Sequence, residues 1–193
     1  MKQSEPVLTP SESLQLIAGV LAGTNNQVRN WRFYFLLWGW LIFAASVLFY
    51  VLKEVAGVKL FFLPFPILVI TGIVVSMVQY RKNRHSSEGY ADQFLQKLWM
   101  VLGLAFIVVV LVSIVRQLPP FTYTMVIGGI GTLVTGMLIR FRPMVVGGVV
   151  FLAMAVASVF VADAYKPLMQ AAAVLSGYLL PGYLYKNEKT TDV

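Results

Sequence analysis

The sequence predicts an all-α integral membrane protein with six transmembrane helices and an N-terminal cytoplasmic amphipathic helix. Two observations carry this prediction. Apolar residues make up 59% of the chain and charged residues only 12%, whereas soluble domains are about 45–50% apolar and about 25% charged. Six segments are also apolar over the roughly 20 residues that a helix needs to cross the hydrocarbon core. This composition excludes a soluble globular protein and a disordered chain.

Residues 1–32 form the expected cytoplasmic N-terminal segment, which is polar and lacks the apolar core of a cleaved signal peptide. Thr9-Pro10-Ser11-Glu12 has the pattern of a capping box with proline at the first helical position. Apolar residues follow it at helical spacing: Leu14, Ile17, Ala18 and Leu21. We therefore expect an amphipathic helix over residues 10–24. Its polar face is not rich in Lys and Arg, so contact with the membrane surface and contact with a protein both stay open.

The expected transmembrane domain covers residues 33–185, and residues 186–193 form a cytoplasmic tail. Charged residues and prolines separate six apolar segments: 33–52, 60–79, 98–115, 121–139, 144–162 and 168–185. Pro143 and Pro167 stand where a helix begins, because the missing N–H of proline would be unpaired there anyway. Pro181 lies inside the sixth segment and is predicted to kink it.

The basic residues divide unequally between the two expected sides. One side carries eleven: Lys2, Arg29, Arg32, Arg81, Lys82, Arg84, Lys97, Arg140, Arg142, Lys186 and Lys189. The other side carries four: Lys53, Lys59, Arg116 and Lys166. The positive-inside rule places the first group, and with it both termini, in the cytoplasm. The net charge of +7 then reflects orientation, and no nucleic-acid partner is expected.

The sequence has no pattern typical of an enzyme. It contains no cysteine and a single histidine, and its eight acidic residues lie in loops, tails or span ends. Nucleophile-elbow, zinc-protease and phosphate-loop motifs are missing. We expect no catalytic residue, no cofactor and no metal site. Coupled transporters usually need a carboxylate within the membrane, which lowers the case for transport.

Small residues concentrate in the last three spans. They recur on shared helix faces: Gly129, Thr132 and Gly136 in the fourth span, Gly148 and Ala155 in the fifth, and Ala173 and Gly177 in the sixth. Small residues let helices approach closely in lipid. We interpret these as candidate helix-packing residues, with a homodimer face or a substrate passage as the alternatives.

Two groups of residues are candidate lipid or partner contacts. Arg81, Lys82 and Arg84 form an exposed basic cluster, which is typical of a topology determinant. Anionic lipid head groups or an acidic protein are the alternative ligands of this cluster. Trp38 and Trp40 flank a glycine in the first span. Helix packing is the simpler interpretation of these two indoles, and a lipid or hydrophobic ligand is the alternative.

Two stretches carry a family resemblance. FLLWGWLIFAAS in the first span and GYLLPGYLYK at the end of the sixth resemble small multi-span membrane proteins of Bacteroidetes, with a WGW-type first span and a PGYLL-type C-terminal end. That resemblance implies a bacterial protein and, through neighbouring helix-turn-helix regulators, envelope signalling, but it carries over no site residue. We expect a non-enzymatic inner-membrane protein that acts through lipid or protein partners, including a homo-oligomer, in envelope regulation or scaffolding. The alternative is a small transporter or channel subunit.

Overall fold

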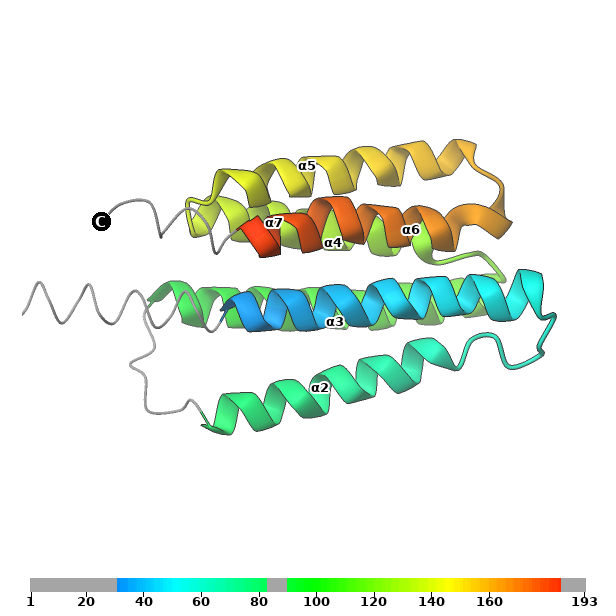
Figure 1. Ribbon diagram of the computed structural model, residues 1–193, viewed down its shortest axis with the longest axis horizontal. Helices are drawn as coiled ribbons and strands as arrows, with labels where there is room; N and C mark the ends of the chain where they lie inside the picture. Colours follow the sequence, from blue (N-terminus) through cyan, green and yellow to red (C-terminus); the bar gives the residue numbers. More distant parts are fainter. Residues whose placement is uncertain (1–30, 83–89, 185–193) are drawn as a thin grey trace, which may run out of the picture.

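A computed structural model describes residues 31–82 and 90–184, which form helices and short turns with no strand among them. Five helices are long and apolar enough to cross a membrane and lie side by side (Figure 1). They are the first helix (Trp31–Val55), α2 (Pro64–Lys82), α3 (Tyr90–Arg116), α4 (Phe121–Leu138) and α5 (Arg142–Ala157). The prediction of an all-α chain with several apolar, membrane-length helices is confirmed.

The sixth predicted span, 168–185, is helical but is not among these five. It is divided into α6 (Lys166–Val174), a π-helical turn, η4 (Leu175–Leu179), and α7 (Leu180–Leu184). The polar and small residues of this segment lower its mean hydropathy. Pro181 also has no N–H to donate to a carbonyl one turn earlier. Five apolar helices of membrane length are therefore found, and the sixth transmembrane helix stays a prediction.

Prolines and charged residues mark the helix ends, as expected. α2 begins at Pro64, and Pro143 and Pro167 lie in the first turns of α5 and α6. Proline is tolerated there because the first N–H groups of a helix have no intrahelical partner. The expected amphipathic helix over 10–24 and the tail 186–193 lie outside the described residues.

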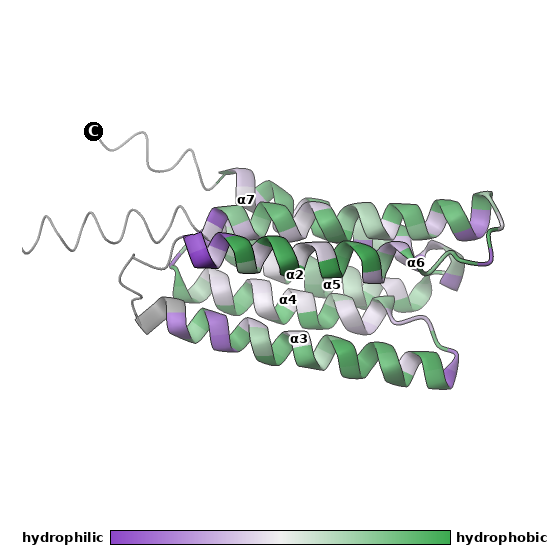
Figure 2. Ribbon diagram, turned by 90° about the horizontal axis from the view of Figure 1, so that it is seen from below, coloured by the Kyte–Doolittle hydropathy of each residue, from purple (hydrophilic) through white to green (hydrophobic). Residues whose placement is uncertain are grey.

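The core lies between α4, α5 and the interrupted sixth segment, with the first helix against it. In the apolar windows of α4 and α5, 44% and 33% of residues are buried, compared with 6% in α2 and in α3. Large buried side chains include Met125, Met144 and Leu179. Figure 2 shows hydrophobic residues along most of the length of α3, and many of them are exposed. α2 and α3 therefore present apolar side chains to the surroundings of the bundle.

Hydrophilic residues gather at the two ends of the bundle (Figure 2). The last turn of α2 contains Arg81 and Lys82. It lies at the same end of the bundle as the short turn between α4 and α5 (Figure 1). The opposite end holds two ion pairs. Lys53 Nζ lies 3.2 Å from Glu54 Oε1, and Lys166 Nζ lies 2.6 Å from Asp163 Oδ1.

Candidate functional site

Gln170 joins three helices inside the bundle. Its Nε2 donates to Ser46 Oγ of the first helix over 3.2 Å, and its Oε1 accepts from Thr124 Oγ1 of α4 over 2.7 Å. All three side chains are buried, and Gln170 is only 5% exposed. Ser46 Oγ in turn donates to the carbonyl oxygen of Ile42 over 2.8 Å. We call Ser46, Thr124 and Gln170 the polar cluster.

An aromatic layer lies next to the polar cluster. Phe49 makes edge-to-face contacts with Phe61, Phe65 and Phe121, with ring centroids 5.2, 5.8 and 5.0 Å apart. Phe49 follows Ser46 by about one helical turn, and Phe121 precedes Thr124 by about one turn. The layer therefore lies nearer the Lys53 end of the bundle than the cluster does, and it separates the cluster from that end.

A second polar contact ties α4 to the turn after α5. The hydroxyl oxygens of Thr122 and Ser158 lie 2.8 Å apart, and Ser158 Oγ also lies 2.7 Å from the carbonyl oxygen of Ala155, to which it donates. Every group in these contacts is neutral near pH 7, so the contacts supply hydrogen bonds and no general acid or base. Within 31–82 and 90–184, no group of three or more His, Cys, Asp or Glu is placed to bind a metal ion.

Two glycines bring α5 and η4 into backbone contact. A Cβ on Gly147 would overlap the carbonyl oxygen of Gly177, and a Cβ on Gly177 would lie 2.6 Å from the carbonyl oxygen of Gly147. Pro181 also reaches this point, with its Cγ 2.9 Å from the Gly147 Cβ position. No side chain fits between the two helices at this point, so their backbones are in direct contact.

The structure places all seven candidate packing residues in the buried interior. Three of the glycines lie where α4 meets α5. A Cβ added to Gly129 would lie 2.8 Å from Leu152, one added to Gly136 would lie 2.6 Å from Val145, and one added to Gly148 would lie 2.6 Å from Leu133. The others are Thr132, Ala155, Ala173 and Gly177. Thr132 donates to the carbonyl oxygen of Gly128 in its own helix over 2.8 Å.

Sequence reasoning missed Gly147 and the partners of Gln170. Gly147 is the first glycine of a Gly-Gly pair, and the pair itself was a usable signal, since two adjacent glycines permit close approach on two faces of one helix. The partners of Gln170 lie 124 and 46 residues away in the chain, and no local pattern links them.

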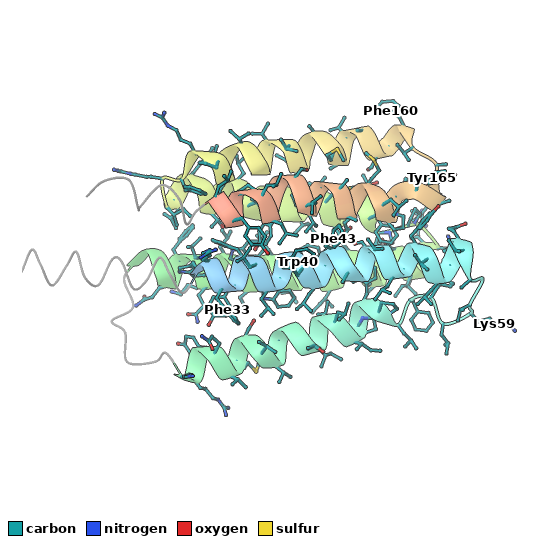
Figure 3. The ribbon with its side chains drawn as sticks, viewed as in Figure 1. Phe33, Trp40, Phe43, Lys59, Phe160 and Tyr165 are labelled. Atoms are coloured by element: carbon teal, nitrogen blue, oxygen red, sulfur yellow. The ribbon has the colours of Figure 1, made fainter. Side chains whose placement is uncertain are left out.

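The two indoles of the first helix lie on different flanks. Trp38 faces α2, where a Cβ on Gly72 would come 3.2 Å from its ring. Trp40 is 47% exposed, and its Nε1 donates to the hydroxyl of Tyr183 in α7 over 3.0 Å. Gly39, between them, lies against Leu179, whose Cδ2 would be 2.6 Å from a Cβ there. Figure 3 shows the side chains of this helix, including Trp40.

The basic candidates lie at one end of the bundle. Arg81 and Lys82 are exposed in the last turn of α2, and Arg84 lies outside the described residues. Arg32, in the first turn of the first helix, has its Nε shielded from solvent with no acceptor among the described residues. An arginine in this state is a suitable donor to an anion.

No family model matches the chain, and no curated protein or solved structure is similar to it.

Proposed function

We propose that this chain is a non-enzymatic, multi-pass protein of the bacterial inner membrane that acts through protein or lipid partners, in envelope regulation or scaffolding. One observation carries the proposal. The buried polar residues of the described ranges are Ser, Thr and one Gln, and the cross-helix hydrogen bonds among them hold the first helix, α4 and α6 together. General acid–base catalysis needs a titratable group near the substrate, and among the buried side chains of the described ranges only the phenol of Tyr178 is titratable.

The proposal includes six membrane crossings with both termini in the cytoplasm. The sixth segment runs back along α5, so its last described turn lies at the same end of the bundle as the first turn of the first helix (Figure 1). Its low hydropathy fits a crossing that is shielded from lipid, because Gln170, Ala173, Gly177 and Leu179 are buried against other helices. The excess of Lys and Arg supports the cytoplasmic placement of this end.

Crosslinking in native membranes tests the partner hypothesis. A photo-crosslinking amino acid at Leu14 or Leu21 of the full chain should give a discrete protein adduct that is identified by mass spectrometry. The same probe at Gly57, in the turn at the opposite end, is the matched control and should give none. Loss of residues 1–30 should abolish the adduct and the associated phenotype. Unchanged partners and phenotype after that deletion would contradict the proposal.

A small transporter or channel subunit is the second candidate, and η4 is the observation that favours it. π-helical turns inside α-helices are frequent at functional sites, and η4 lies in the middle of the sixth segment. Proteoliposomes that contain only this chain would show solute flux if this candidate is correct. Flux that G177A abolishes, while G103A leaves it intact, would replace the partner hypothesis with transport.

A further inference from the structure

An apolar groove of about 480 Å³ runs along the outer face of the first helix. Its lining residues recur at helical spacing: Phe33, Leu36, Leu37, Trp40, Leu41 and Ala44. Residues three and four apart share one face of a helix. Figure 1 shows the first helix between α7 on one side and α2 on the other, so neighbouring helices lie on both sides of this face.

Both flanks of the groove are fixed by contacts. On the α2 side, the Cδ1 of Leu41 would lie 2.8 Å from a Cβ on Gly72, so this leucine is packed against the α2 backbone. On the α7 side, the hydrogen bond from Trp40 to Tyr183 holds the indole ring. An indole N–H in hydrocarbon has no water to bond. This bond therefore keeps the ring in place as one wall of the groove.

The groove has the length of one membrane leaflet. From Phe33 to Ala44 a helix rises about 16 Å at about 1.5 Å per residue. The hydrocarbon core is about 30 Å thick, so the groove covers about half of it. It starts one residue after Arg32 and ends near the middle of the first helix. A single extended acyl chain fits this length and this apolar lining.

Basic residues lie at the end of the bundle where the groove begins at Phe33. Arg32 directly precedes Phe33, and its Nε has no acceptor within the described part of the chain. The last turn of α2 and the first turn of the first helix lie at the same end of the bundle (Figure 1). Arg81 and Lys82 belong to that last turn and are exposed. Such a set of cations is complementary to a phosphate group.

We propose that the groove binds one anionic phospholipid of the leaflet on the Arg81 side, with an acyl chain along Phe33 to Ala44 and its phosphate beside Arg32, Arg81 and Lys82. The inference rests on the proposed function for its membrane setting. A second copy of the chain is a poorer occupant, because the same end of its helices carries further basic residues, Arg140 and Arg142. It would add positive charge where an anion is needed.

Native mass spectrometry of the full chain in a neutral detergent tests this proposal. The probes are phosphatidylglycerol and phosphatidylcholine with identical acyl chains. Each of the three basic residues should attract an anionic lipid by about 1 kcal/mol, so we expect one retained phosphatidylglycerol with a preference of about a hundredfold. R81Q/K82Q should reduce this preference to about fivefold, the part that Arg32 contributes. K59Q/R116Q removes two exposed charges from the opposite end and should leave the preference unchanged.

A groove-filling variant tests the acyl-chain site. A44F should displace both lipids, whereas V101F, on the exposed face of α3, should displace neither. Equal retention of the two lipids by the native chain, or an unchanged preference in R81Q/K82Q, would overturn the proposal. A dimer that A44F dissociates, with no lipid retained, would also overturn it and assign the groove to a second copy. None of these variants alters residues 1–30. The lipid-binding proposal can therefore fail while the crosslinking test of the proposed function succeeds, and the reverse.

Discussion

Gln170 illustrates how a single polar residue is accommodated in an apolar interior. An amide moved from water into an apolar medium without a partner costs several kcal/mol, and its two hydrogen bonds to Ser46 and Thr124 remove most of that cost. Bonds of this kind between membrane helices contribute on average only about 0.6 kcal/mol each. The polar cluster therefore fixes which faces of three helices meet more than it adds to the total stability.

The variant T124V tests the contribution of the hydrogen bond between Thr124 and Gln170, because valine has nearly the shape of threonine and lacks its hydroxyl. We expect the free energy of unfolding, measured by unfolding in mixed detergent micelles, to fall by about 1 kcal/mol. T71V is the matched control, since Thr71 Oγ1 bonds the Ile67 carbonyl of its own helix at an exposed position. The effects of T124V and Q170L should not add in the double variant. Full additivity, or an equal loss in T71V, would contradict the cross-helix bond.

The backbone of Arg140 is strained. It has φ of 53° in the turn between α4 and α5, a left-handed conformation that costs a residue with a Cβ about 1–2 kcal/mol. R140G should remove this strain, but glycine loses more conformational freedom on folding. We therefore expect a net rise in the free energy of unfolding of about 0.5–1 kcal/mol. R140Q removes the same charge and keeps the Cβ, so it should give no gain. A gain of equal size in R140Q would assign the effect to charge.

At the scale of helices, the bundle has a closely packed part and a loosely attached part. α4, α5 and the sixth segment meet through glycines, whereas α2 and α3 bury few of their side chains. Lipid tails are as apolar as the side chains of these helices, so moving a side chain from lipid into the bundle releases little free energy. Close van der Waals contact therefore decides which membrane helices associate. Glycines at the contact points therefore determine the core of this protein, and larger apolar residues cover its periphery.

Gly147 is the element-scale test of this packing. G147A places a methyl group against the carbonyl oxygen of Gly177, and the two backbones must separate. We expect a loss of about 1–3 kcal/mol, the usual cost of overpacking a core. G103A is the matched control, because a Cβ there meets nothing within 4 Å, and alanine should stabilise that helix by up to about 1 kcal/mol. Equal effects of the two variants would show that α5 and η4 are not in backbone contact.

The helices could be located from the sequence and their contacts could not. Pro143 and Pro167 marked the starts of α5 and α6, because proline is readily accommodated in the first turn of a helix. The π-helical turn was not predicted, although Pro181 suggested a local irregularity. η4 contains Gly177, which contacts Gly147 of α5, and such a contact between distant residues is not visible in a local pattern.

For the whole molecule, the predicted topology depends on the sorting of the basic residues and on whether the sixth segment crosses the membrane. Five crossings would place the C-terminal tail opposite the loop between α2 and α3, and six crossings would place it on the same side. The interrupted segment buries Gln170, Ala173, Gly177 and Leu179 and exposes Leu175 and Leu180. The side on which the tail lies therefore decides between the two topologies.

Single cysteines measure this directly, because the chain contains none of its own. In intact cells, a membrane-impermeant thiol reagent should label G57C and leave S87C and T190C unlabelled until the membrane is opened. The positive-inside rule and six crossings require this result, since residues 87 and 190 both belong to the basic side. Labelling of T190C but not S87C from outside would mean that the sixth segment does not cross. Labelling of S87C from outside would reverse the orientation, and with it the leaflet from which the groove takes its lipid.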